Sequence, residues 1–95
     1  MNQTDIQRIK DFEYKYDEVS RVMSALDTAI SEYNDIKQWI ADLKDYQESG
    51  QWLKDFEADE RGELPGGLKR GVLAEDALHD LLTSVDNILK QAREL

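Results

Sequence analysis

DFEADERGELPGGLKRG, residues 55–71, contains the point at which the helical pattern of this chain stops. It holds five carboxylates, three cations, four glycines and one proline in seventeen positions. Proline lacks an amide hydrogen and favours an extended residue before it, and glycine tolerates the backbone angles of a helix end. The stretch therefore predicts a non-helical loop over residues 61–73, with helices on both sides.

A short helix is expected just before this loop, over about residues 50–60. Ser49 and Gly50 separate it from the preceding segment, because both residue types are typical of helix ends. Its apolar side is Trp52, Leu53 and Phe56. The acidic residues between them are expected to face water.

A long helix is predicted upstream, over about residues 5–48, with the capping-box sequence TDIQ at Thr4–Gln7 as its start. Eight apolar residues alternate three and four positions apart and so fall on one side of that helix. These residues, named the apolar stripe from here on, are Ile9, Phe12, Tyr16, Val19, Met23, Leu26, Ile30 and Tyr33. The pattern resembles a coiled coil over about three and a half heptads.

The spacing changes after Tyr33, where the next apolar residues are Ile36, Trp39, Ile40, Leu43 and Tyr46. Two structures fit this change of phase. In one, the helix runs on, continuous or gently kinked near Asn34; in the other, it breaks there and the chain folds into a self-contained bundle.

A terminal helix is predicted over about residues 74–93, with Glu75 and Asp76 in its first turn, where negative charge meets the positive end of the helix dipole. Its apolar positions again alternate four and three, so this face should pack on another helix. They are Ala74, Leu78, Leu81, Val85, Ile88, Ala92 and Leu95, flanked by Leu82 and Leu89.

Residues 1–95 are thus expected to form a single all-α domain, an antiparallel helical hairpin or small bundle. A continuous first helix would be roughly 65 Å long against roughly 30 Å for the terminal helix, so one cannot cover the other. A bare apolar row of that size usually marks an interface. The principal hypothesis is a non-enzymatic interaction module whose apolar stripe packs on a second copy or on a partner's helix.

The composition narrows the classes of partner. There are 21 acidic and 12 basic residues, a net charge of −9, which disfavours nucleic acid and anionic membrane surfaces. The chain has no cysteine, so disulfides, thiolate chemistry and cysteine–zinc sites are excluded and a cytoplasmic location is expected. No apolar run approaches the ~18–20 residues of a membrane span, and MNQTDIQRIK lacks the apolar core of a signal peptide.

The segment of residues 52–73, named the corner, holds the second group of candidate residues: Trp52, Asp55, Phe56, Asp59, Lys69 and Arg70. Its carboxylates lack the spacing of a calcium loop, and no metal or other cofactor is expected. The simplest interpretation is structural, with the cations of the loop pairing with the acids of the short helix. The alternative hypothesis is an accessory protein that binds a small ligand, a peptide or a divalent cation at the corner.

Catalysis is the least supported class, and no enzymatic activity is predicted. The single histidine, His79, lies among Glu75, Asp76 and Asp80 and is expected at the surface. GELPGG lacks the following lysine and serine or threonine of a P-loop, and no nucleophile elbow is present.

The corner also carries a resemblance to a known family. The matching residues are Trp52-Leu53, Asp55-Phe56-Glu57-Ala58-Asp59-Glu60, Gly62, Leu64-Pro65, Leu68-Lys69-Arg70-Gly71-Val72-Leu73 and Glu75-Asp76. This pattern resembles that of small, mostly Gram-positive bacterial proteins classed as a domain of unknown function. The chain departs from it at Ala74, where the family has serine, and at His79, where it has an aromatic residue. The resemblance implies a helical fold and an intracellular bacterial setting, and it implies no activity.

Overall fold

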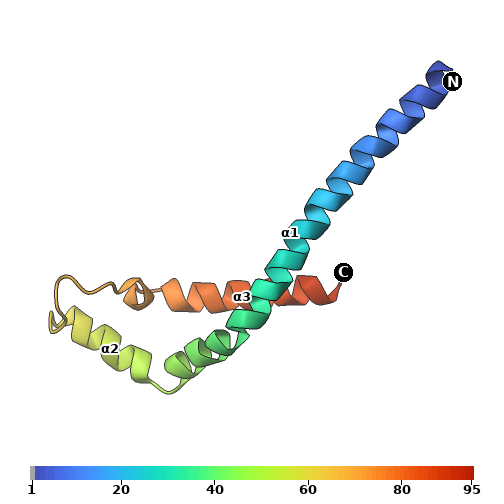
Figure 1. Ribbon diagram of the computed structural model, residues 1–95. Coiled ribbons are helices and arrows are strands. Elements are labelled where there is room, and N and C mark those ends of the chain that lie inside the picture. Colours follow the sequence, from blue (N-terminus) through green and yellow to red (C-terminus); the bar gives the residue numbers. More distant parts are fainter. Residues whose placement is uncertain (1) are drawn as a thin grey trace. The chain divides into compact units, whose positions relative to one another are not determined.

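The structure, a computed structural model that describes residues 2–95, is built from helices (Figure 1). Helix α1 spans Gln3–Glu48, α2 spans Gln51–Glu60 and α3 spans Ala77–Arg93, and a short 3-10 helix, η1, covers Gly71–Leu73. The described residues contain no strand. The prediction of an all-α protein with a long first helix, a short middle helix and a terminal helix is therefore confirmed.

The start of α1 differs from the predicted capping box. The backbone amide of Asp5 donates to the side-chain oxygen of Asn2 over 2.8 Å, so Asn2 caps the helix, and Thr4 is already part of its first turn. Asparagine and threonine both accept this bond well, and the helix extends to the earlier of the two residues. Beyond this cap, α1 continues through Asn34 without interruption.

Two glycines shape the ends of α2. Gly50, just before the helix, has φ of +87°, and Gly62, just after it, has φ of +73°. Left-handed angles of this kind cost little for glycine because it has no side chain to collide with the backbone. These glycines allow the chain to change direction on both sides of a ten-residue helix.

The terminal helix begins at Ala77, three residues later than predicted. Ala74 has the extended angles φ −62° and ψ 139° that follow η1, and helical angles cannot continue through such a residue. Glu75 and Asp76 therefore precede α3 rather than occupying its first turn.

The described chain divides into two compact units, one ending at Lys37 and the other spanning Gln38–Leu95. The first unit consists of helix α1 from Gln3 to Lys37 and the capping residue before it. The second unit contains the last turns of α1, both other helices and the loop that joins them. No helix of the described chain is long and apolar enough to cross a membrane.

The core lies in the second unit, where Leu73, Leu78 and Leu82 are only 6%, 2% and 7% exposed. Val85 and Leu89 of α3 are half-buried on the same side. The loop after α2 reverses the chain, so Asp86 of α3 accepts a hydrogen bond from Lys44 of α1 over 3.3 Å.

The packed face of α3 is narrower than the predicted face. Leu81 and Ile88, which were expected to pack on another helix, remain 50% and 59% exposed. The buried side of α3 runs through Leu78 and Val85 of the predicted row and through Leu82 and Leu89, which the periodicity placed at its flank. The hydrophobic pattern thus identifies the apolar half of the helix but not which edge of it the neighbours cover.

Candidate functional site

The apolar stripe is exposed along its whole length. The exposed fraction of its eight side chains ranges from 36% for Tyr33 to 70% for Tyr16. Within its own unit no second segment exists to cover it, because that unit is a single helix. The stripe is therefore an unpartnered helix face.

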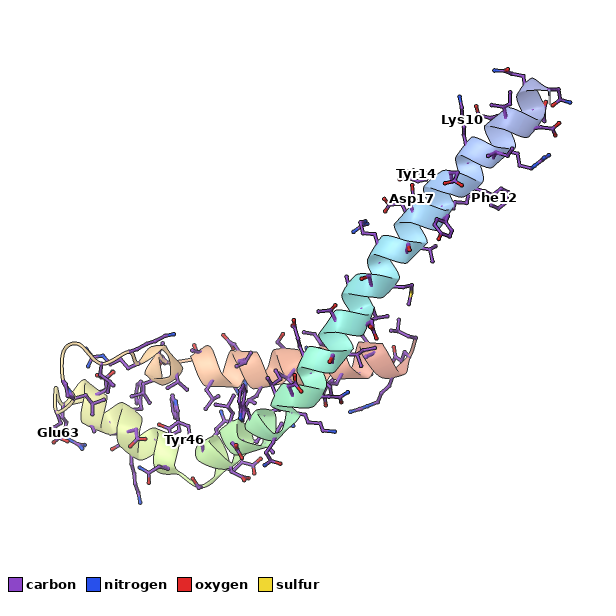
Figure 2. All side chains as sticks on the ribbon, viewed as in Figure 1. Lys10, Phe12, Tyr14, Asp17, Tyr46 and Glu63 are labelled. Atoms are coloured by element: carbon purple, nitrogen blue, oxygen red, sulfur yellow. The ribbon has the colours of Figure 1, made fainter. Side chains whose placement is uncertain are left out.

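The opposite side of α1 differs in character. Figure 2 shows Phe12 on one side of the helix and Lys10, Tyr14 and Asp17 on the other. This separation follows from the rotation of about 100° per residue in an α-helix, which places residues two positions apart on nearly opposite sides. The helix accordingly has one apolar and one mainly polar face.

A shallow hollow lies on the amino-terminal half of the stripe. Its floor is apolar and its rims are charged, and the residues that line it are Arg8, Ile9, Phe12, Glu13, Lys15, Tyr16 and Val19. Arg8 and Lys15 form one rim, and Glu13 lies on the other side of the apolar row. The two edges of the stripe thus carry opposite charges at this end.

The charged side chains near the hollow make local contacts. Arg8 pairs with Asp5, one turn earlier, over 3.0 Å, and both side chains are substantially exposed. The Lys15 ammonium lies 5.1 Å from the centroid of the Phe12 ring, a cation–π contact. Exposed pairs of this kind contribute ~0–1 kcal/mol each, so a partner could replace them at little cost.

The corner is held together by contacts between α2 and the loop. The Trp52 indole N–H donates to the backbone carbonyl of Val72 over 2.8 Å, a bond across twenty residues of sequence. Trp52 also stacks on Phe56 with ring centroids 5.1 Å apart. The hydrogen bond ties α2 to η1 beside the buried Leu73, and the stacking within α2 orients the Trp52 ring.

Asp55 is engaged by two donors. Its carboxylate accepts a hydrogen bond from the Tyr46 hydroxyl over 2.5 Å and another from the Gln51 amide over 2.9 Å. These hydrogen bonds, the one from Tyr46 first, lower the pKa of the Asp55 carboxyl. Burial, together with the hydrogen bond to Asp55 and the charge on it, raises the pKa of Tyr46 to about 12.

The cations of the loop have different partners. Arg70 pairs with Asp59 of α2 over 3.1 Å, which is the kind of contact that the sequence suggested. Arg61 pairs with Glu63 instead, over 2.9 Å, and the hydrogen bond from its guanidinium lowers the pKa of the Glu63 carboxyl. Lys69 makes no ion pair with any residue that the structure describes.

A small hollow lies between the last turns of α1, α2 and the loop. It is lined by Tyr46, Asp55, Leu64, Leu68, Lys69, Arg70, Val72 and Leu73. Of the six candidate corner residues, the structure brings Asp55, Lys69 and Arg70 to this hollow. Trp52 and Asp59 bind the segment after α2, and Phe56 stacks on Trp52. Among the residues described, Lys69 is the one charged residue lining this hollow that forms no ion pair or side-chain hydrogen bond.

Tyr46 is the member of this group that the sequence did not indicate. Its helical spacing from Leu43 placed it among the apolar residues of the first helix, and nothing in the sequence pointed to Asp55 as its partner. The two residues meet only because Gly50 turns the chain between them.

The described residues contain no group of three or more histidine, cysteine or carboxylate side chains placed to hold a metal ion. His79 is exposed on α3, as expected.

The family model described as "Domain of unknown function (DUF4298)" matches residues 9–95. The match confirms the expected resemblance to a domain of unknown function. It includes the apolar stripe as well as the corner, so both candidate surfaces lie inside the matched region. No curated protein and no solved structure matches the sequence.

Proposed function

Because this chain belongs to the DUF4298 family, whose description assigns no activity, we propose a function from the chain's own surface. The protein is a small, non-enzymatic interaction module that packs the apolar stripe of α1 against another helix, from a second copy or from a partner protein. It acts in the cytoplasm, a reducing compartment that suits a chain without cysteine.

The exposure of the apolar stripe is the observation that carries this proposal. Val19 and Phe12 are each 61% exposed, and Met23 and Ile30 are about half exposed, in one continuous row. Proteins rarely leave a contiguous apolar surface of this length in water unless it binds something. Because the opposite face of α1 is mainly polar, only the side that carries the stripe is expected to bind the partner.

The number of residues in the row also matters. Burying one large apolar side chain stabilises a complex by ~1.5–3 kcal/mol, whereas association costs at least ~4 kcal/mol in lost translational and rotational freedom. A single side chain cannot offset even the lower value of that cost, whereas a row of eight can. The stripe is therefore long enough to support association by helix packing alone.

Tyr16 and Tyr14 offer a matched pair for testing the proposal. They are the same residue type and almost equally exposed, at 70% and 69%, but they lie on opposite sides of α1. Each would be replaced in turn by the photo-crosslinking residue benzoylphenylalanine, and the full-length protein would be irradiated inside the cells that produce it. We expect a discrete crosslinked product from position 16 and none from position 14.

Equal crosslinking at the two positions would contradict the proposal, and so would the absence of any product from position 16. The identity of the crosslinked species, established by mass spectrometry, then distinguishes a second copy of the chain from a different protein. A crosslink to either one supports the interaction function.

A second candidate function is the binding of a small anion at the corner, favoured by the free ammonium of Lys69 in a hollow whose lining includes four apolar side chains. The carboxylates nearby are engaged by Tyr46 and Arg70, which leaves Lys69 to receive a ligand. A panel of small carboxylates and phosphates should then raise the melting temperature, and Lys69→Ala should abolish the increase. A divalent cation whose stabilising effect is lost in Asp59→Ala would instead favour cation binding.

A further inference from the structure

We infer that the occupant of the apolar stripe is a second copy of this chain, lying parallel and in register, so that Arg8 of each copy pairs with Glu13 of the other. This inference rests on the proposed function, because it requires the stripe to pack on a helix. It adds the identity of the partner, its direction and its register.

The residues that border the stripe carry the argument. When two helices pack through such a row, the residues at its two edges meet those of the facing helix, and their charges select partner and direction. Some edge residues directly precede a residue of the stripe, as Arg8 precedes Ile9. In a parallel, in-register pair, each of them faces the edge residue five positions later on the other helix. Arg8 then faces Glu13, and the symmetry of the pair creates this attraction twice.

The other edge positions are compatible with this arrangement. Each remaining pair combines a charged or polar residue with an uncharged one: Lys15 with Ser20, Val22 with Asp27, and Ala29 with Asn34. No like charges are opposed. Two chains that each carry a net charge of −9 repel one another overall, so the local charge pattern at the contact has to be favourable.

The antiparallel arrangement has the opposite property. With Ile9 opposite Tyr33 of the second copy, the acidic edge of each helix runs along the acidic edge of the other. Glu13 then lies beside Asp27 of the second copy at both ends of the contact. Like charges in such positions are destabilising, so the edge residues favour the parallel direction.

The hollow on the stripe has the form that a parallel partner requires. In this kind of packing, each side chain of the row inserts among four residues of the facing helix. Two such sets of four line the hollow: Ile9, Phe12, Glu13 and Tyr16, and then Phe12, Lys15, Tyr16 and Val19. In register, Phe12 and Tyr16 of the second copy enter these sets, and aromatic side chains meet aromatic side chains, a favourable pairing.

The absence of cysteine allows the direction to be measured with single introduced thiols. In the parallel pair, Ile30→Cys places two thiols opposite each other, within the ~7 Å between Cα atoms that a disulfide can bridge. In the antiparallel pair, Ile30 faces Phe12, and the two introduced thiols are about 27 Å apart. We expect Ile30→Cys to form a disulfide-linked dimer on mild oxidation, and Thr28→Cys, on the opposite side of the same helix turn, to remain unlinked.

Light scattering on the unmodified full chain provides the companion measurement. We expect a molar mass of about 22 kDa, twice the 11.0 kDa of the chain, falling to one chain in Leu26→Asp. A mass of one chain at millimolar concentration would overturn the inference, as would disulfide formation between Ile30→Cys and Phe12→Cys chains but not between two Ile30→Cys chains. In either case a crosslink from position 16, to another protein or to a second copy in the antiparallel direction, would leave the proposed function standing.

Charge reversal tests the ion pairs themselves. Glu13→Arg should weaken the dimer about tenfold, because two exposed ion pairs together change an affinity by about that factor. Combining it with Arg8→Glu restores the attraction with reversed polarity, so the double variant should recover most of the affinity. A double variant as weak as Glu13→Arg would show that these residues do not face each other.

Discussion

Two parts of this molecule carry the same kind of apolar pattern and differ in what covers it. Leu78 and Leu82 of α3 are 2% and 7% exposed, whereas Leu26 and Val19 on the apolar stripe are 37% and 61% exposed. Around α3 the chain turns at Gly50 and again after Gly62, and these turns bring neighbouring elements onto the helix. The unit that ends at Lys37 contains no turn, so its apolar face has no neighbour there.

This comparison shows that an amphipathic pattern predicts only that a face can be buried. Whether the face is buried within the chain depends on whether turns return other segments to it. A face with the pattern but without the turns is suited to a partner molecule. The contrast between α3 and the stripe can be tested by the same substitution in both places.

Leu78→Ala and Leu26→Ala remove the same atoms from the two regions. Leu78→Ala should lower the free energy of unfolding of the second unit by ~2–5 kcal/mol, because it leaves a cavity in a small core. Urea denaturation followed by tryptophan fluorescence reports on this unit, since both tryptophans lie within it.

Leu26→Ala should leave that unfolding transition unchanged and instead raise the dimer dissociation constant by at least about 100-fold. Light scattering over a dilution series measures this change. A loss of stability in the second unit on Leu26→Ala, measured below the dissociation constant, would contradict the division between the two regions.

Gly50→Ala tests the turn that allows the second unit to cover its own apolar face. An alanine at φ of +87° should cost ~1–2 kcal/mol, although nothing lies within 4 Å of the added methyl group. Gly66→Ala is the matched control, because that glycine has the same open surroundings without a left-handed backbone angle. If both variants lost the same stability in thermal denaturation, the backbone angle would not be the reason.

Trp52→Phe tests a contact that joins α2 to the loop. The substitution keeps an aromatic ring beside Phe56 but removes the donor to the Val72 carbonyl, so a loss of ~0.5–1.5 kcal/mol is expected. Trp39→Phe serves as control, since Trp39 is 63% exposed. Equal losses in the two variants, measured by urea denaturation with circular dichroism, would show that the hydrogen bond does not stabilise the corner.

Tyr46→Phe should have the smallest effect at neutral pH and a larger one on the pH dependence. The raised pKa of Tyr46 means that its contribution to stability is present below pH 10.0 and is lost as pH rises toward about 12. The lowered pKa of Asp55 means that its contribution is present above pH 3.8 and is lost as pH falls below that value.

In Tyr46→Phe both dependences should be reduced, and the ultraviolet titration should lose the phenol that ionises near pH 12. Melting temperatures across the pH range provide the measurement. A variant with unchanged pH dependence would show that the hydrogen bond between Tyr46 and Asp55 does not contribute to stability in solution.

Several features of the fold follow directly from sequence periodicity and residue type. The order of the helices, the loop around Pro65 and the composition of the apolar stripe all depend on interactions between residues a few positions apart. Errors of a few residues arose where two residues could serve the same role. Thr4 and Asn2 are both good caps, and Ala74 could have started a helix but is extended after η1.

The corner was predictable in part. The pairing of loop cations with α2 acids anticipated the contact between Arg70 and Asp59, because the residues are close in sequence and opposite in charge. The role of Tyr46 was not predictable, because its hydrogen bond to Asp55 depends on the angle at which α2 leaves α1. No local pattern specifies that angle; it follows from one glycine with a left-handed conformation.

The amino-acid sequence alone was sufficient to establish an all-helical chain, its long first helix and the apolar stripe, because helix formation and amphipathicity depend on neighbours three and four positions away. The folded arrangement was needed to know that Leu82 is buried while Leu81 is exposed, and that Trp52 reaches Val72. Burial and long-range hydrogen bonds depend on where the turns place distant residues, and small differences in turn geometry displace whole helices.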